Sequence, residues 1–121
     1  MARLTSDLFV SALLNNAQAR GIFGGVIAKG FSTAGAVHIV CYNPSDGCYT
    51  IYSPAPQVTL DEDQPPVGGR AFEYRRSFEA YGLLQEFVEA EKRFDNDLWV
   101  VELEAPASAC DGLFSIIDST D

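Results

Sequence analysis

The sequence contains a single histidine, His38, and this scarcity limits the chemistry that the chain can carry out. Hydrolysis by a serine or cysteine nucleophile requires a base that takes the proton and a further group that orients the base. Ser32 lies among glycines in the segment 30–35, but their spacing differs from that of a nucleophile elbow. We therefore expect no catalytic residues, and we interpret the segment 30–35 as a hairpin loop between two strands.

Cysteine is also scarce, and the three residues present, Cys41, Cys48 and Cys110, have no C-x-x-C spacing. An odd number of cysteines without that spacing excludes an obvious disulfide framework and an obvious zinc site. A redox pair of Cys41 and Cys48, which flank an expected turn, is the less favoured alternative to three reduced thiols. The acidic residues 61–63 lack the spacing of a calcium loop, so we expect neither a metal site nor a cofactor.

Basic residues are few: 8 Lys and Arg stand against 17 Asp and Glu, and the formal net charge is −9. A field of this sign repels phosphate backbones and anionic lipid surfaces, which argues against binding to nucleic acid or to membranes. The same field attracts basic protein surfaces. The acidic excess therefore favours a basic protein as partner. As an alternative, the chain could bind such a protein by mimicking nucleic acid.

Long hydrophobic runs are absent, since no segment approaches the roughly 18 apolar residues that span a bilayer. The apolar run from Leu8 to Leu14 loosely resembles a secretory signal, but Asp7 lies where such a signal is positively charged. At about 100° per residue the segment 6–20 separates polar from apolar side chains, as a surface helix does. We therefore expect a cytoplasmic protein.

Hydrophobic periodicity predicts one α+β domain over residues 1–105, followed by a C-terminal tail or edge strand over residues 106–121. Helices are expected at 6–20 and 81–94, where apolar side chains recur at helical spacing. Segments rich in β-branched and aromatic residues predict strands at 26–29, 36–42, 48–52, 71–78 and 98–103. The order α-β-β-β-β-α-β favours an antiparallel or mixed sheet of four to five strands, with the two helices packed on one face.

The segment 54–69 collects prolines and glycines around acidic residues, which is typical of a long exposed loop. Directly after it, three arginines form a local basic cluster in an acidic chain. Such a cluster could receive an anionic ligand, with the loop as a lid, or pair with carboxylates of the protein itself. The candidate ligand-binding residues are Arg70, Tyr74, Arg76 and His38.

Three sequence motifs resemble a known family. They are LTSDL at 4–8, SPAPQ at 53–57 and RFDNDLWVVE at 93–102. Together they are similar to the short alphaproteobacterial family catalogued as domain of unknown function 1491. Members of that family often carry two arginines near the end of the first helix, where this chain has Asn15 and Asn16. The resemblance implies a bacterial cytoplasmic protein and supplies no active site.

The third motif has a structural interpretation. Asp95 and Asp97 suit the turn between a helix and a strand, and Trp99 is expected to fill one face of the sheet.

Our leading hypothesis is a non-enzymatic protein–protein interaction or regulatory module, with a second copy of the chain or a basic protein as its partner. It rests on the missing catalytic constellation, the acidic composition and a β-rich fold that leaves an open sheet edge. The first alternative is a small-ligand-binding domain or modest enzyme with the segment 54–69 as a lid. The second alternative is an acidic mimic of nucleic acid.

Overall fold

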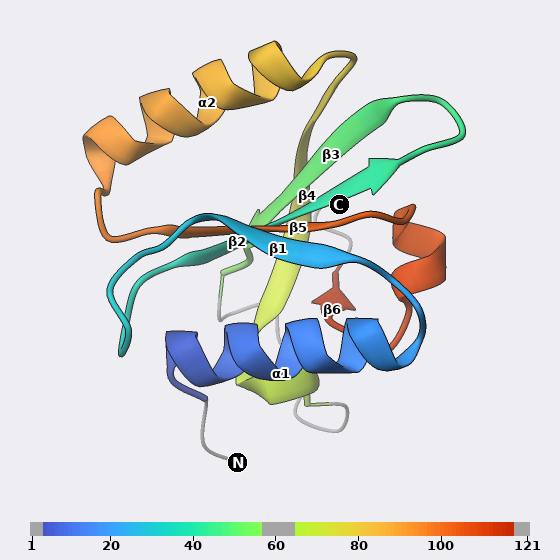
Figure 1. Ribbon diagram of the computed structural model, residues 1–121. Coiled ribbons are helices and arrows are strands. Elements are labelled where there is room, and N and C mark those ends of the chain that lie inside the picture. Colours follow the sequence, from blue (N-terminus) through green and yellow to red (C-terminus); the bar gives the residue numbers. More distant parts are fainter. Residues whose placement is uncertain (1–3, 57–64, 118–121) are drawn as a thin grey trace.

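The computed structural model describes residues 4–56 and 65–117, which form an α+β fold around one mixed sheet (Figure 1). In chain order the elements are α1 (Ser6–Ala19), β1 (Gly24–Ala28), β2 (Val37–Asn43), β3 (Cys48–Pro54), the 3-10 helix η2 (Val67–Gly69), β4 (Ala71–Phe78), α2 (Tyr81–Phe94), β5 (Trp99–Leu103), the 3-10 helix η3 (Ala107–Cys110) and β6 (Ser115–Ile116). The predicted class, element order and mixed sheet are confirmed. The sheet has six strands, where four to five were predicted, because β6 adds to it.

The strands lie in the order β1-β5-β2-β3-β4-β6. β2, β3 and β4 form an antiparallel meander, whereas β5 pairs antiparallel with β1 and parallel with β2. The predicted hairpin around the segment 30–35 is therefore wrong, because β5 lies between the two strands that this segment joins. Trp99, Val100 and Val101 are all buried, so β5 belongs in the interior of the sheet.

The two helices lie on opposite faces of the sheet (Figure 1). Phe9 and Leu13 of α1 pack in one core cluster with Ile39, whereas Leu84 of α2 packs in another with Val40. Successive side chains of a strand point to opposite faces, so Ile39 and Val40 serve different cores. The expectation that both helices pack on one face is wrong, because the central strands are apolar on both sides and require cover on each.

α1 leads the chain to the edge of the sheet. Phe9, Leu13 and Ala17 recur at helical spacing and are buried. Gly21 follows the helix with φ of 78°, and its N–H donates to the Gln18 carbonyl. The chain then enters β1, the strand at one end of the sheet order.

α2 is attached to the sheet by few apolar side chains. Leu84 and Val88 are buried, and Phe87 packs partly against the same cluster. Leu83 and Phe94 remain exposed. Each helix has 14 residues, and within the described ranges no helix is both long and apolar enough to cross a membrane.

The chain after β5 folds back onto the α1 face of the sheet. Cys110 in η3 is buried in the core, as are Leu113 and Phe114. β6 then pairs in parallel with the first two residues of β4. Among residues 4–56 and 65–117, no strand pairs with the outer side of β4 beyond Phe72.

The segment between α2 and β5 anchors the loop between β1 and β2. Asp95 forms the predicted turn by accepting a hydrogen bond from the Asp97 N–H at 3.0 Å. The Asp97 carbonyl accepts from the Phe31 N–H at 3.0 Å, and the Trp99 Nε1–H donates to the Phe31 carbonyl at 2.9 Å. Trp99 is buried, as predicted. The motif therefore has a structural role.

Candidate functional site

Arg70, the first predicted ligand-binding residue, is buried on the α1 side of the sheet. Its Nη2 donates to the Leu4 carbonyl and to the Ser6 hydroxyl, each at 3.0 Å, and its guanidinium lies over the Phe9 ring at 5.6 Å. These contacts tie the start of α1 to the start of β4. Most of the predicted lid, residues 57–64, lies outside the described residues.

Tyr74 and Arg76 follow on β4, and their side chains lie on opposite faces of the sheet. Tyr74 is 58% exposed, and its ring meets that of Tyr52 edge-on on the α1 side. Arg76 lies over the Phe78 ring at 5.5 Å on the α2 side, where it lines a groove of about 690 Å³ between β4 and α2. The sheet therefore separates the predicted residues, and they do not share one pocket.

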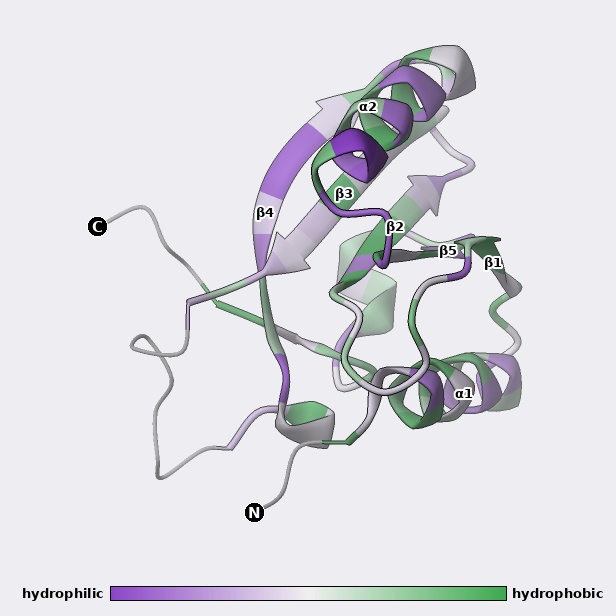
Figure 2. Ribbon diagram, turned by 90° about the vertical axis from the view of Figure 1, so that its left-hand side faces the viewer, coloured by the Kyte–Doolittle hydropathy of each residue, from purple (hydrophilic) through white to green (hydrophobic). Residues whose placement is uncertain are grey.

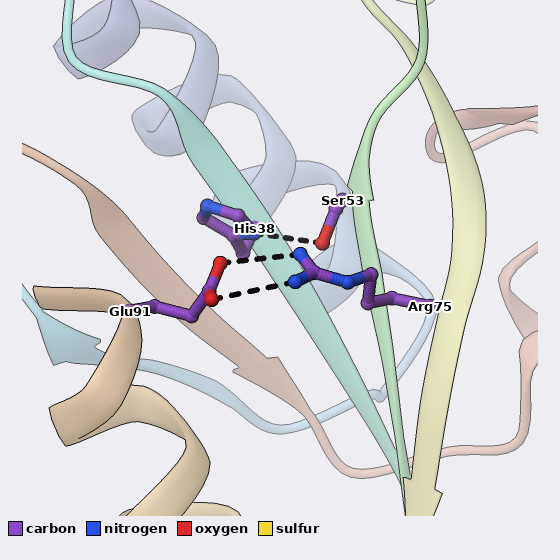
Figure 3. Close-up of polar contacts among 4 residues, drawn as sticks. All are labelled: His38, Ser53, Arg75 and Glu91. Carbon is purple, nitrogen blue, oxygen red and sulfur yellow. Dashed lines mark hydrogen bonds and ion pairs between the residues drawn. The ribbon is translucent and has the colours of Figure 1, made fainter. Parts of the chain in front are cut away.

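His38 lies in a polar cluster beneath α2, which Figure 3 shows. Its Nδ1 is 2.9 Å from the Ser53 Oγ on β3, and both residues are buried. Arg75 of β4 donates from its two terminal nitrogens to the carboxylate oxygens of Glu91 on α2, at 3.1 and 3.3 Å. In Figure 3 the Glu91 carboxylate points toward the Arg75 guanidinium beside the His38 ring. One contact thus joins β2 to β3, and the other joins β4 to α2.

Arg75 is the extra residue of a β-bulge. β3 and β4 pair Ile51 with Arg76 and Tyr52 with Tyr74, so Arg75 has no directly opposite residue on β3. A bulge interrupts the alternation of side chains, so Arg75 and Arg76 both lie on the α2 side, where Arg75 meets Glu91. Because both side chains remain partly exposed, at 42% and 24%, we expect this pair to contribute no more than about 1 kcal/mol.

The His38–Ser53 contact has the distance of a base and a nucleophile but lacks their accessibility. A nucleophilic serine must be reached by its substrate, whereas Ser53 is 5% exposed and His38 is 7% exposed. Burial lowers the pKa of His38, the nearby Arg75 lowers it further, and Glu91 and Asp95 oppose these effects. Burial therefore favours the neutral imidazole of His38, and the contact between the sheet and α2 is made by Arg75 and Glu91.

His38 is expected to make the protein less stable in mild acid. Because burial holds its folded-state pKa below the ordinary value of 6.5, the unfolded chain binds an extra proton as the pH falls below 6.5. The stability that His38 contributes is present above pH 6.5 and is lost as the pH falls through the folded-state pKa. The free energy of unfolding in urea should decline as the pH falls below 6.5. His38→Asn, which keeps a hydrogen-bonding group beside Ser53, should flatten that decline.

The charges that face His38 belong to Glu91, Arg75 and Asp95. Because the chain has one histidine, an NMR titration of its ring reports the folded-state pKa directly. A folded-state pKa at or above the ordinary value, or the same decline in the His38→Asn variant, would contradict this prediction.

The second candidate site is the free edge of β1. β1 pairs with β5 on one side, and no strand in the part of the chain that the structure describes pairs with its other side. Its five residues, GGVIA, include no charged side chain, and a register shift between Val26 and Ala28 ends its regular part. Phe23, directly before the strand, is 79% exposed, and Val26 is 44% exposed. An uncharged open edge is a template for pairing with another chain.

The backbone of β1 alternates between β5 and the free edge. The Glu104 N–H donates to the Phe23 carbonyl at 2.8 Å, which makes these two residues a hydrogen-bonded pair. Bonded and non-bonded pairs alternate in an antiparallel ladder, so Gly25 and Glu102 form the next bonded pair. The N–H and C=O groups of the residues on either side of Gly25 therefore point toward the free edge.

A hollow of about 270 Å³ lies along this edge. It is lined by Phe23, Gly24, Gly25, Val26, Ile27, Glu102 and Glu104. Gly25 lies opposite Glu102, and a Cβ atom built on Gly25 would meet nothing within 4 Å. The missing side chain therefore leaves open space across β1 beside the Glu102 side chain.

Glu102 and Glu104 give the hollow its charge. Their neighbours Val101 and Leu103 pack in the core on the α1 side, so alternation directs both glutamates to the α2 side. Burial raises the pKa of Glu102, and the nearby Glu104 raises it further. A carboxylate in this situation is stabilised by an arriving cation.

The opposite side of the sheet, along β4, carries features that disfavour pairing with another strand. Its outer part carries Glu73, Arg75 and Arg76 and contains the bulge at Arg75. In Figure 2 most of β4 has hydrophilic colours. Charged side chains and bulges are the devices that protect edge strands from unwanted pairing. Of β1 and β4, β1 is therefore the strand with the less protected edge.

Sequence reasoning missed the site at β1. The hydropathy pattern predicts a strand near Val26, but it does not show that this strand ends the sheet or that Glu102 lies beside it. The signal that was available is the composition of β1, in which two glycines and no charge occur within an acidic chain.

Cys41 and Cys48 do not lie opposite each other, as a redox pair of these two cysteines would require. Cys41 lies opposite Thr50, two residues along from the pair formed by Cys48 and Asn43. The Cys41 thiol instead hydrogen-bonds to the Cys110 sulfur, and this contact raises the pKa of Cys41. Among the described residues, no three His, Cys, Asp or Glu side chains group together where they could hold a metal ion.

Comparison with known proteins identifies a family. The model of DUF1491, described as a protein of unknown function, matches residues 4–110. A search of curated proteins finds no match.

Solved structures share this fold. The solution structure of protein Atu0922 from A. tumefaciens has 34% sequence identity and a TM-score of 0.77, and the match covers 99% of each chain. The crystal structure of a DUF1491 family protein from Caulobacter crescentus has 28% identity and a TM-score of 0.68, over 85% of this chain and 87% of that chain. An NMR structure of a DUF1491 family protein from C. crescentus has 28% identity and a TM-score of 0.70, over 97% and 99%.

Proposed function

This chain belongs to the DUF1491 family, as its motifs predicted, and since that description names no activity, we propose a function from the structure: a non-enzymatic protein–protein interaction module. In this proposal β1 accepts an extended segment of a partner as an additional strand. The observation that carries the proposal is the open, uncharged edge of β1 with the exposed Phe23 beside it.

Strand addition uses backbone groups for affinity and alternate side chains for specificity. On β1 the backbone groups of Gly24 and Val26 face the free edge, and they supply the donors and acceptors for a partner strand. Phe23 supplies a large exposed ring at one end of the edge. Exposed aromatic side chains are typical anchors of protein interfaces.

A binding role fits the polar groups better than a catalytic role does. His38 and Ser53 are buried beneath α2, away from the hollow at β1. The side chains that line the hollow offer carboxylates and apolar surface, without a hydroxyl, thiol or imidazole group. Acidic and apolar groups without a nucleophile suit recognition.

The partner in this proposal is a different protein. Two copies of a chain with a net charge of −9 repel each other, whereas a basic protein is attracted. Because the regular part of β1 is short, we expect a transient complex with a dissociation constant of about 1–100 μM.

A peptide selection tests the proposal. The folded chain is immobilised and offered displayed random peptides of about ten residues, the length of a long strand. The proposal predicts enrichment of extended, β-branched sequences that shift the NMR signals of β1 when they bind. Enrichment of amphipathic helices that shift α2 instead, or no enrichment above an unrelated acidic protein, would contradict it. A stable dimer in light scattering would contradict the proposal of a foreign partner and would indicate that a second copy of the chain binds instead.

A further inference from the structure

We propose that the segment that pairs with β1 is basic: an extended peptide whose Lys or Arg side chain, opposite Gly25, reaches across β1 to Glu102 and Glu104. This inference rests on the proposed function, because it assumes strand addition at β1 and names the chemistry of the added strand.

The geometry of β1 makes the position opposite Gly25 distinctive. The polar backbone groups of Gly25 point to β5, so a residue opposite it on an antiparallel added strand belongs to a non-hydrogen-bonded pair. Side chains approach most closely in such pairs. Because Gly25 has no side chain, a long side chain from the added strand can lie over its backbone.

The distance to be crossed matches a basic side chain. Neighbouring strands lie about 4.8 Å apart, so the added strand and β5 are separated by about 10 Å across β1. An extended Lys or Arg together with the Glu102 side chain spans that separation. Aspartate and other short side chains do not reach it from the same position.

The electrostatics of the hollow favour a cation. Glu102 is partly desolvated and is repelled by Glu104, as the raised pKa of Glu102 indicates. An acid whose folded-state pKa is raised lowers stability when it is ionised at neutral pH, and an arriving ammonium or guanidinium removes that penalty. Phe23 lines the same hollow and offers apolar surface to the stem of a Lys or Arg side chain.

A second copy of the chain does not supply this cation from the same strand. The residues of β1 are uncharged, and Lys29 follows only after the register shift at its end. Pairing of two β1 strands would bring together two acidic hollows. The charge at this edge therefore favours a foreign basic segment.

Two matched peptides test the inference. Both are blocked, about ten residues long and built of alternating Thr and Val, with Lys at the central position in one and Gln in the other. Fluorescence anisotropy at low salt should give about tenfold tighter binding for the Lys peptide. Added salt should reduce this ratio, because part of the attraction is screened.

Three variants assign the effect to the hollow. Glu102→Gln should lower the ratio of the two affinities, because only the Glu104 carboxylate then remains in the hollow, and Gly25→Val should bring the ratio close to one by filling the open space. Glu73→Gln removes a glutamate from the opposite sheet edge and should leave the ratio unchanged. Thermal unfolding of each variant checks that it is folded.

The outcomes separate this inference from the proposed function. If the Gln peptide binds as tightly as the Lys peptide, or if the ratio survives in Glu102→Gln, the inference is overturned while strand addition stands. If neither peptide binds to the wild-type chain, strand addition at β1 fails as well. A dimer of this chain that pairs through β1 would also overturn the inference that the partner is a foreign basic segment.

Discussion

Replacing Val26 with proline is expected to weaken the binding of an extended peptide at least about tenfold and to leave the protein folded. The Val26 N–H points toward the free edge, so proline removes a donor offered to a partner without removing a bond of the β1–β5 ladder. One lost hydrogen bond costs about 0.5–1.5 kcal/mol, and the proline ring also obstructs the approach of the partner strand. A loss of about 1.4 kcal/mol corresponds to a tenfold change in affinity.

The control for this prediction is Val26→Thr, which keeps the N–H and the branched side chain. Its affinity for the selected peptides should stay close to that of the wild-type chain, and the unfolding transitions of both variants should show one folded species. If Val26→Pro binds the peptides as tightly as Val26→Thr does, partners do not pair with the backbone of β1.

Substitution of Gly30 by alanine is expected to lower the free energy of unfolding more than the other substitutions proposed for this protein do. A Cβ atom on Gly30 would lie 2.0 Å from the Asp97 carbonyl oxygen and 2.5 Å from the Leu98 carbonyl oxygen. Both neighbours are backbone atoms directly before β5, and they cannot move aside as a side chain can. Overpacking of this kind costs about 1–3 kcal/mol and sometimes more, out of a total stability of about 5–15 kcal/mol.

Gly35→Ala should have a similar effect, because its Cβ would lie 2.2 Å from the same Asp97 oxygen. Gly82→Ala is the matched control: Gly82 lies in α2, a Cβ there would meet nothing within 4 Å, and alanine favours a helix by up to about 1 kcal/mol. Urea unfolding measures all three variants. If Gly30→Ala is as stable as Gly82→Ala, the loop between β1 and β2 is not packed on the Asp97 backbone.

The sequence predicts the elements of this fold well because helices and strands depend on local periodicity. The two helices and the meander of β2, β3 and β4 follow from apolar spacing and from the expected turn that Cys41 and Cys48 flank. The arrangement of these elements depends on long-range contacts. That β5 enters between β1 and β2 depends on how Trp99, Val100 and Val101 are covered on both faces, which no local window contains.

The candidate site was harder to predict for the same reason. The sequence identifies Arg70 as one of the few cations of an acidic chain, and the structure uses it to hold the start of α1. Strict alternation along β4 would place Arg76 on the same face as Tyr74, and only the bulge at Arg75 moves Arg76 to the α2 side. Hydropathy does not reveal bulges. The hollow at β1 combines Gly25 with Glu102, and these residues become neighbours only in the folded sheet.

Amide hydrogen exchange, followed by NMR with and without a selected peptide, tests the central claim most directly. In the free protein the Gly25 N–H should be protected by β5, whereas the N–H groups of Gly24 and Val26 should exchange rapidly. Strand addition at β1 predicts that the bound peptide slows exchange at Gly24 and Val26 and leaves β4 unchanged. Unchanged exchange at these two residues, with new protection on β4 or α2, would contradict it.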